Sequence, residues 1–192
     1  MGNNILLIFC IIFVLSSLYL SSDSYNLKCV VAKKDGNTYC VRDTDKLQDS
    51  VELLATATAR MEKIVKYLKR KFPKDPRIIY LVQNFNPRKI VETLPNSEYT
   101  AYSEGKGAKL AFCLRKHKHE MDLIDINTLT FVALHELTHL MTKSFNHLPE
   151  FWANFKFILK HANDIGIYDS VDYRESPTGY CGLEIDSNPT YG

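Results

Sequence analysis

The sequence lacks several features that mark common classes of protein. No C-x-x-C pair occurs among the five cysteines, which argues against a zinc site built from cysteine thiolates. The formal net charge is only +2 over 192 residues, too small by itself to indicate nucleic-acid binding. Internal repeats and low-complexity segments are absent from the sequence. What remains is an ordinary globular composition, 45% hydrophobic and 24% charged, with room for one well-filled core.

An uncharged apolar segment, Ile5 to Leu20, begins almost at the N-terminus. It lacks the basic residues that open a secretory signal and the A-x-A-like site at which such a signal is cleaved. Its length is at the short end of a membrane-spanning helix. We therefore expect a single-pass anchor through residues 5–20, rather than a cleaved signal peptide that would leave the protein secreted. Residues 1–24 then form an anchor and linker, and residues 25–192 form one folded domain.

Two further patterns bear on the compartment of this domain. Lysines follow the apolar segment and no basic side chain precedes it, so the positive-inside tendency places the domain on the cytosolic side of the membrane. The cysteines leave the question open. Cys29, Cys40, Cys113 and Cys181 could pair as disulfides in an oxidising compartment, or remain as buried thiols in a reducing one.

The residue patterns predict an α+β domain. Two strand-like runs, 27–32 and 38–42, flank Asp35-Gly36, a strong hairpin signal that would bring Cys29 close to Cys40. Asn127 is a candidate N-cap for a helix that follows it. The periodicity of apolar residues predicts helices at 45–72, 128–143 and 149–165, strands at 77–82 and 108–115, and an irregular loop at 84–97.

The most informative stretch is an H-E-x-x-H sequence at residues 135–139, inside an apolar run with helical character. Positions i and i+4 lie one turn apart on the same helix face, so His135 and His139 can direct imidazole nitrogens at one metal ion. Two neutral imidazoles suit Zn²⁺, and the adjacent carboxylate of Glu136 can take a proton from a metal-bound water. The alternative is an amphipathic helix that buries two histidines.

A third ligand has to come from beyond His139, where His147 and Glu150 are the candidates. If the helix continued, His147 would lie about two turns further along the axis, too far to share the metal. The chain must therefore turn back, and residues 144–146 offer a place for the turn before Pro149 begins the next helix. We predict His147 as the third ligand, and Glu150 is the alternative that a longer turn would favour.

The motif at 135–139, followed by Asn146-His147-Leu-Pro-Glu-Phe151-Trp152, resembles the WLM-type and YgjP-like zinc metallopeptidases. Their pattern is H-E-L-x-H, a short loop, and then H-x-x-x-F-[WY]; the loop here is slightly longer. Several further segments, each a weaker match by itself, resemble segments of the metallopeptidases of this type that large DNA viruses encode. These matches lie at residues 35–42, 99–102, 105–107, 112–115 and 180–182.

The resemblance implies a compact zincin-like α+β fold with a small, mostly antiparallel sheet beside the active helix. One edge strand of that sheet would flank the cleft, and by analogy with zincins we assign this edge to residues 109–114. An extended peptide could add to such an edge by backbone hydrogen bonds.

The predicted protein is a membrane-anchored zinc endopeptidase that acts on a polypeptide substrate. Zn²⁺ would be held by His135, His139 and His147, with water in the fourth position. Glu136 would act as general base on this water and then pass the proton to the leaving amine. The sequence does not choose an oxyanion-stabilising residue among its candidates, Arg115, Tyr168, Tyr173 and Tyr180.

Two other classes of function compete with this prediction. The first is a non-catalytic, zinc-containing interaction module at a membrane or viral envelope, although such a module has no need of Glu136. The second is a protease acting on nucleic-acid-associated proteins, which the WLM resemblance suggests. Its local support is a run of basic residues from Arg60 to Lys71, for which a solvated helix face is the favoured explanation. Nucleic acid is therefore not expected as a partner, whereas the membrane is.

Overall fold

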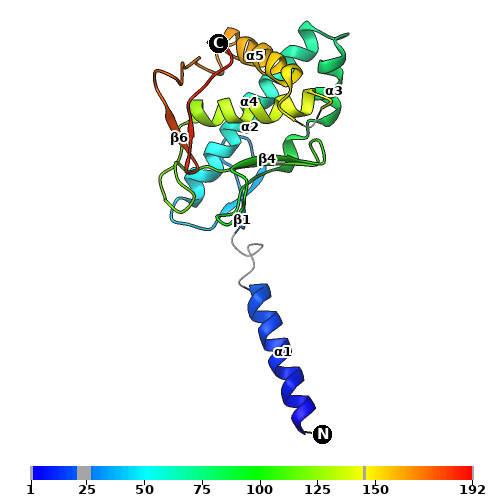
Figure 1. Cartoon of the computed structure of the whole chain (residues 1–192), viewed down its shortest axis with the longest axis vertical. Coiled ribbons are helices and arrows are strands. Elements are labelled where there is room, and N and C mark those ends of the chain that lie inside the picture. The colour runs from blue at the N-terminus through cyan, green and yellow to red at the C-terminus, as the bar shows by residue number, and fades with distance from the viewer. Residues whose placement is uncertain (1, 21–26, 145, 192) are drawn as a thin grey trace.

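The computed structural model describes residues 2–20, 27–144 and 146–191 (Figure 1). Its elements in chain order are α1 (Gly2–Leu20), β1 (Leu27–Val31), β2 (Thr38–Arg42), α2 (Leu47–Lys71), α3 (Pro76–Asn84), the short 3₁₀ helix η2 (Pro87–Lys89), β3 (Ile90–Glu92), β4 (Ala101–Glu104), β5 (Lys109–Phe112), α4 (Ile126–Met141), α5 (Pro149–Asp164), β6 (Thr178–Tyr180) and β7 (Leu183–Ile185).

Five strands form one sheet in the order β1-β2-β3-β5-β4. The two outer pairs, β1 with β2 and β5 with β4, are antiparallel, whereas β3 is parallel to both of its neighbours. The sheet is therefore mixed, and the predicted mostly antiparallel sheet is wrong. The difference arises at β3, a three-residue strand inside the segment 84–97 that was predicted as an irregular loop. So short a strand carries no alternation that a sequence pattern could reveal.

The helices form two layers above this sheet (Figure 1). Helices α2 and α4 pack against the strands and against each other, and α3 and α5 pack on α4. Helix α4 is consequently buried around almost its whole circumference, which explains the apolar run that encloses the H-E-x-x-H sequence. The three long helices and the β1–β2 hairpin lie within a few residues of their predicted bounds.

Residues 77–82 lie in helix α3, not in the strand that their β-branched run predicted. The Asp75 side chain accepts a hydrogen bond from the amide of Arg77 at 2.9 Å, and Pro76 occupies the first helical position. Both features favour a helix start. This N-cap and the packing of α3 on α4 outweigh the strand propensity of Ile78 and Ile79.

Helix α4 is capped by Asp125 and not by Asn127. The Asp125 carboxylate accepts hydrogen bonds from the amides of Asn127 and Thr128, each at 2.9 Å. Asn127 instead exchanges two hydrogen bonds of 2.8 Å with the backbone of Asp169. The start of the H-E-x-x-H helix is thereby joined to the segment that follows α5.

A buried carboxylate holds the middle of the sheet together. The side chain of Glu92, on β3, is 0% exposed and accepts a hydrogen bond of 2.8 Å from the amide of Arg42. Its other oxygen lies 3.3 Å from Nε of Arg42 and 3.6 Å from Nε of Arg115. Arg115 also donates to the carbonyl of Met121 at 2.9 Å, so the cluster fixes the loop after β5 as well. Burial raises the pKa of Glu92, and the two guanidinium groups oppose this effect.

The four cysteines of the domain, which the sequence left as either disulfides or free thiols, form two disulfides. Cys29 faces Cys40 across the β1–β2 ladder and is bonded to it, as the predicted hairpin suggested. Cys113, just after β5, is bonded to Cys181 in the turn between β6 and β7. Disulfides persist in oxidising compartments, so these bonds argue against the predicted cytosolic placement of the domain.

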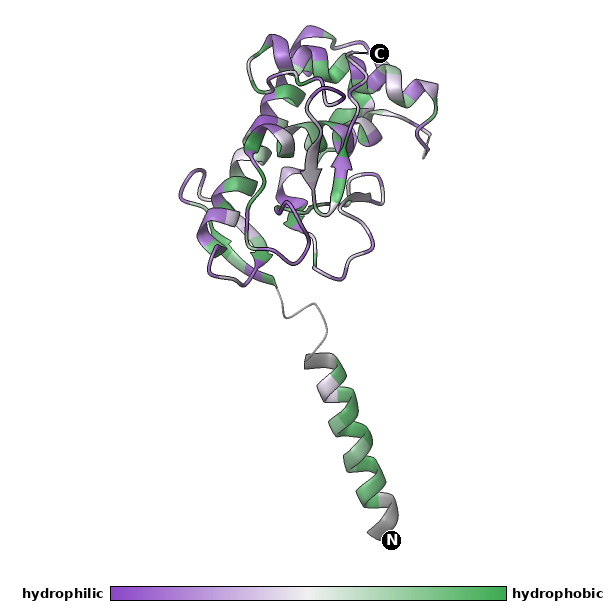
Figure 2. Cartoon of the chain, turned by 60° about the vertical axis from the view of Figure 1, so that its left-hand side comes forward, coloured by the Kyte–Doolittle hydropathy of each residue, from purple (hydrophilic) through white to green (hydrophobic). Residues whose placement is uncertain are grey.

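Helix α1 corrects the expectation of a membrane anchor. Among the residues that the structure describes, no helix is both long enough and apolar enough to cross a bilayer. The predicted transmembrane helix and single-pass localisation are therefore wrong. Figure 2 shows the apolar character on all sides of α1; the predicted linker at 21–24 lies outside the described residues.

Replacing Glu92 tests the buried charge cluster. Glu92→Ala leaves two buried guanidinium groups without their carboxylate, and we expect the free energy of unfolding to fall by about 3–5 kcal/mol. Urea denaturation of the oxidised protein measures this change. Glu62→Ala, at an exposed position of α2, is the matched control and should change the free energy by less than about 0.5 kcal/mol. Equal effects of the two substitutions would contradict the role assigned to Glu92.

Candidate metal centre

Helix α4 presents two histidines on the face that lines a cleft. His135 and His139 are separated by one helical turn, and their ring centroids lie 5.0 Å apart. The chain then reverses direction and α5 begins at Pro149, so that His147 in the connecting turn reaches the same place. Nε2 of His147 lies 3.1 Å from Nε2 of His135 and 3.1 Å from Nε2 of His139.

The spacing of the three imidazoles fits a tetrahedral metal ion. One ligand atom from each ring lies within 4.8 Å of the others. Zinc–nitrogen bonds of about 2.0–2.1 Å in tetrahedral geometry separate the nitrogens by about 3.3 Å, close to the observed separations. The structure therefore brings together the three histidines predicted as ligands. Glu150, the alternative third ligand, lies on the exposed first turn of α5 and is outside the group.

The electrostatics of the site favour neutral imidazoles, the form that binds metals. Burial and the neighbouring histidines lower the pKa of His135 to about 3. Burial, together with His147 and Lys106, lowers the pKa of His139 to about 4. Burial also lowers the pKa of His147. None of the three rings needs to lose a proton at neutral pH before it coordinates a cation.

Glu136 lies beside this group with one carboxylate oxygen unpaired. Its side chain is buried, and Oε2 has no hydrogen-bond partner among the residues that the structure describes. Burial raises the pKa of Glu136 to about 8. An unpaired carboxylate oxygen in such a place is costly unless a water molecule or an ion completes it, and a cation at the three imidazoles would favour its charged form.

Two aromatic residues of α5 fix the orientation of the rings. The Phe151 ring packs on all three imidazoles, with centroid separations of 4.8 Å to His135, 4.5 Å to His139 and 4.5 Å to His147. The ring of Trp152 lies 5.6 Å from that of His147 on the outer side. The F-W pair at the end of the sequence motif thus packs against the histidine rings.

Lys106 holds the end of α4 and the turn that follows it. Its ammonium group donates to the carbonyls of Thr142 at 2.8 Å, Ser144 at 3.0 Å and His139 at 3.3 Å. Carbonyls in the last turn of a helix have no partner within the helix, so one cation satisfies several of them at once. Lys106 therefore links the second histidine to the turn that carries the third.

The segment 105–107, which carries Lys106, packs closely against the rest of the domain at Gly107. All three residues have positive φ, at 53°, 54° and 102°. A Cβ atom at Gly107 would lie 2.0 Å from the carbonyl oxygen of Asn84, so no larger residue fits there.

A second set of hydrogen bonds holds the same turn from the side of α5. Asn154 donates to Oγ1 of Thr142 at 3.0 Å and accepts from Arg77 of α3 at 3.0 Å. Asn154 is itself buried. The turn between the second and third histidines is thus held directly by Lys106 and Asn154, and Asn154 is held in its turn by Arg77.

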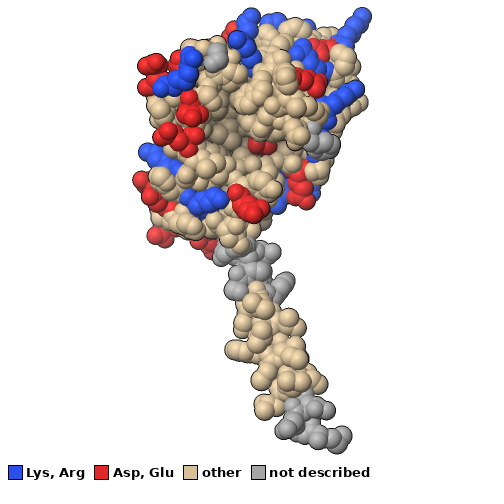
Figure 3. All heavy atoms as spheres, in the orientation of Figure 1, with Lys and Arg blue, Asp and Glu red and all other residues tan. Residues whose placement is uncertain are grey.

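The cleft in front of the histidines consists of two adjoining hollows, and β4 forms one side of both. We call the first the tyrosine hollow. It has a volume of about 350 Å³ and borders the three histidines and Glu136; its remaining lining residues are Tyr99, Ala101, Tyr102, Ser103, Gly105 and Lys106. Figure 3 shows a depression on this face with charged side chains gathered around its rim.

We call the second the hairpin hollow, because part of its wall is the β6–β7 hairpin. It has a volume of about 240 Å³ and also borders His135 and Glu136; its remaining lining residues are Thr100, Ala101, Phe131, Val132, Tyr180, Leu183, Glu184 and Ile185. The two hollows meet at Ala101, His135 and Glu136.

The strand that flanks the cleft is β4 and not the predicted segment 109–114. That segment contains β5, which lies between β3 and β4, so the edge position belongs to β4. The four residues of β4 lack the length and apolar character on which the sequence prediction relied, and only the pairing with β5 identifies it.

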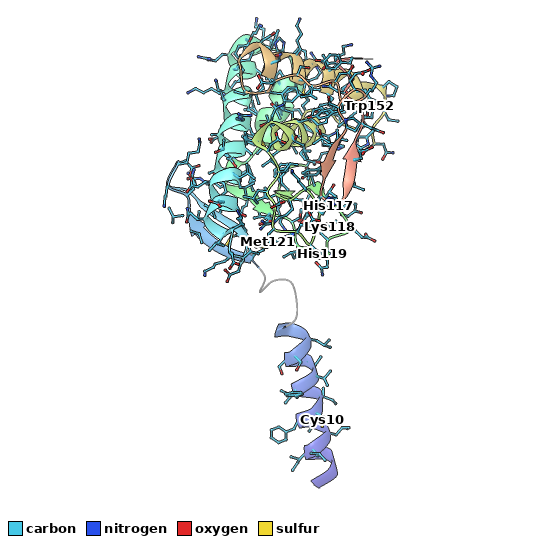
Figure 4. All side chains as sticks on the ribbon, turned by 90° about the vertical axis from the view of Figure 1, so that its left-hand side faces the viewer. Cys10, His117, Lys118, His119, Met121 and Trp152 are labelled. Atoms are coloured by element: carbon cyan, nitrogen blue, oxygen red, sulfur yellow. A yellow bond between two sulfur atoms is a disulfide. The ribbon has the colours of Figure 1, made fainter. Side chains whose placement is uncertain are left out.

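Other predicted candidates lie away from the cleft. His117 and His119, in the segment between β5 and α4, lie well apart from Trp152 (Figure 4). Arg115 is engaged with Glu92. Of the three candidate tyrosines only Tyr180 lines a hollow, and its hydroxyl donates to the carbonyl of Thr100 at 3.2 Å.

Sequence similarity places relatives of the chain in viruses. It is 31% identical over 185 residues to the uncharacterized protein R325 of Acanthamoeba polyphaga mimivirus. The aligned region covers 94% of this chain and 91% of R325. The chain is also 34% identical over 64 residues to the uncharacterized protein 136R of Invertebrate iridescent virus 6. This aligned region covers 33% of the chain and 36% of 136R. No family model matches the chain. No solved structure matches it. The predicted resemblance to viral proteins is thus confirmed at the level of these relatives.

The role of His147 is tested by zinc content. We expect the full chain loaded with zinc to retain about one ion per chain after dialysis, and His147→Ala to lose most of it, because three protein ligands complete such a site. Glu150→Ala, a substitution three residues away, should retain the metal. If His147→Ala binds zinc as well as the parent does, the third ligand is a different residue.

The role of Lys106 is tested by zinc affinity. Lys106→Met removes the donor to three carbonyls, and we expect the affinity for zinc, measured by competition with a chelator, to fall about 10- to 100-fold. Lys106→Arg should recover part of the loss because a guanidinium group can donate to the same carbonyls. Lys109→Met is the control, since the ammonium group of Lys109 donates to the hydroxyl of Tyr102 on the neighbouring strand. Unchanged affinity in Lys106→Met would show that the turn holds its shape without this cation.

Proposed function

The chain belongs to the same family as protein R325 of Acanthamoeba polyphaga mimivirus, and we propose that it is a zinc-dependent endopeptidase. One arrangement carries this proposal: Glu136, whose Oε2 has no hydrogen-bond partner among the described residues, is next to the first of three converging histidines and borders both hollows of the cleft. The resemblance of residues 135–152 to WLM-type and YgjP-like metallopeptidases supports the same activity.

The three histidines are the residues that would hold the zinc ion. Nitrogen ligands at this spacing suit zinc, and a set of three leaves one coordination position open, as in catalytic rather than structural sites. Zinc bound there would supply a Lewis acid that polarises a carbonyl group and lowers the pKa of a water molecule. Phe151 and the carbonyl contacts of Lys106 keep the ligands in place beforehand, so that little rearrangement is needed on binding.

Glu136 is the residue that would move the proton. Its carboxylate takes a proton from the attacking water as the water oxygen adds to the scissile carbonyl, and then passes that proton to the nitrogen of the leaving amine. Two features suit Glu136 to this task. Its side chain is buried, so bulk water does not compete for the carboxylate, and its free oxygen has no internal hydrogen bond to break.

An extended polypeptide is the substrate that suits the shape of the cleft. The outer edge of β4 is not paired with another strand of the sheet, and its residues 101–103 line the tyrosine hollow. An edge strand can pair with a peptide through backbone hydrogen bonds. Because a hollow lies on each side of Glu136, the chain can extend in both directions from the bond to be cleaved, which favours an endopeptidase over an exopeptidase.

The competing functions have less support. A non-catalytic interaction module would have no use for a buried carboxylate with an unpaired oxygen. A protease of nucleic-acid-associated proteins would be expected to keep its basic residues available on α2. Three of them are engaged within the protein: Arg60 donates to Thr130, Lys63 to the carbonyl of Ile165, and Lys71 to the hydroxyl of Tyr67.

Replacing Glu136 separates catalysis from metal binding. We expect Glu136→Gln to lower the rate of peptide hydrolysis at least 100-fold, because an amide cannot accept the proton, while the zinc content stays at the parental level. Hydrolysis is measured on a mixture of internally quenched peptides, and zinc by elemental analysis. Glu150→Gln, at an exposed position outside the ligand group, should keep the parental rate. A Glu136→Gln protein that cleaves as fast as the parent would overturn the proposed mechanism.

A further inference from the structure

Both hollows of the cleft combine polar and apolar side chains. The tyrosine hollow is lined by tyrosine and serine hydroxyl groups and by Lys106. The hairpin hollow is lined by the apolar side chains of Phe131, Val132, Leu183 and Ile185, beside the carboxylates of Glu136 and Glu184. Among the described residues that line the hairpin hollow there is neither lysine nor arginine. An acidic side chain would therefore find no counter-charge in it, whereas an apolar side chain would be removed from water.

One wall of the hairpin hollow is part of the H-E-x-x-H helix. Val132 precedes Glu136 by four residues and His135 by three, so it lies on the same face of α4. Phe131 is backed by three rings, with centroid separations of 4.9 Å to Tyr173 and 5.1 Å to Phe155. Its third neighbour is Tyr168 at 5.9 Å. This wall is consequently rigid and lies next to the reacting groups.

The opposite wall is the β6–β7 hairpin, which is fixed to the body. Cys181 is bonded to Cys113, and its amide donates to the carbonyl of Arg115 at 3.0 Å. Leu183 and Ile185 are two residues apart on β7, so their side chains lie on the same face of that strand. Leu183 is nevertheless 60% exposed, although it borders a hollow lined by apolar groups.

We propose that the hairpin hollow binds one large apolar side chain of the substrate, adjacent to the bond that is cleaved. The ligand class is a polypeptide segment with leucine, methionine or phenylalanine at that position. A volume of about 240 Å³ is smaller than sites for drug-sized ligands and suits a single side chain. This inference rests on the proposed endopeptidase activity and adds its specificity.

Hydroxamates test the subsite without turnover, since this group chelates zinc. Three probes are compared by calorimetry on the zinc-loaded full chain: acetohydroxamate, a hydroxamate with an isobutyl arm and one with a carboxymethyl arm. We expect the isobutyl probe to bind about 10- to 100-fold more tightly than acetohydroxamate, from burial of its arm, and the carboxymethyl probe to bind no more tightly than acetohydroxamate.

A charge introduced at Leu183 should reverse this preference. In Leu183→Arg the isobutyl probe should lose most of its advantage and the carboxymethyl probe should gain affinity, because the arm would meet a guanidinium group. The exposure of Leu183 makes the substitution tolerable for folding. Ile79→Arg, at a 45% exposed position of α3 outside the cleft, is the control and should leave all three affinities unchanged. Affinities that do not depend on the arm would overturn the subsite.

A second measurement is independent of metal and of hydrolysis. Methyl resonances of Val132, Leu183 and Ile185 are followed in the metal-free full chain while N-acetyl-leucine amide or N-acetyl-aspartate amide is added. Selective shifts with the leucine amide support the subsite, and equal or absent shifts with both amides overturn it. Absence of zinc binding or of peptide hydrolysis would overturn the proposed function instead. The methyl resonances would still test whether the subsite binds an apolar side chain.

Discussion

A single helix can supply only two of the three histidines that surround this candidate metal position, and the third has to return from beyond the helix end. The turn between α4 and α5 solves this problem with contacts from outside itself. Lys106 donates to carbonyls in the last turn of α4 and in the turn that follows it, and Asn154 joins Thr142 to Arg77. Because the peptide groups in a turn after a helix lack regular partners, these contacts determine where His147 lies. The cleft, its two hollows and the proposed chemistry all depend on that position.

The sequence predicted correctly those elements that are marked by a pattern within one continuous segment of the chain. The helices α2, α4 and α5 have sustained periodicity, the β1–β2 hairpin has its Asp-Gly turn, and the spacing of the H-E-x-x-H motif requires its two histidines to share a face. It failed where pairing partners decide the structure. Strands β3 and β4 are three and four residues long, and their place in a mixed sheet follows from neighbours distant in sequence. Lys106 was missed for the same reason, since its partners are carbonyl groups more than 30 residues away.

Two other errors have a common physical origin. The apolar residues 5–20 and the β-branched residues 77–82 were each assigned mainly from their apolar character. The first segment falls short of the required length, and the second is governed by the N-cap at Asp75 and by packing on α4. In both cases a geometrical requirement outweighed the intrinsic preference of the residues. The buried cluster of Glu92 with two arginines is a further example, because only the fold reveals that these charges meet.

The bond between Cys113 and Cys181 has a topological consequence. It closes a covalent ring that spans 68 positions of the sequence, and both α4 and α5, with all three histidines and Glu136, lie inside that ring. A single break in the backbone anywhere between the two cysteines leaves one molecule, with both fragments still joined. If the chain cleaves peptide bonds as proposed, its own copies are potential substrates. A nick in an exposed loop of this ring would then leave the three histidines, Glu136 and the walls of the cleft in one covalently joined molecule.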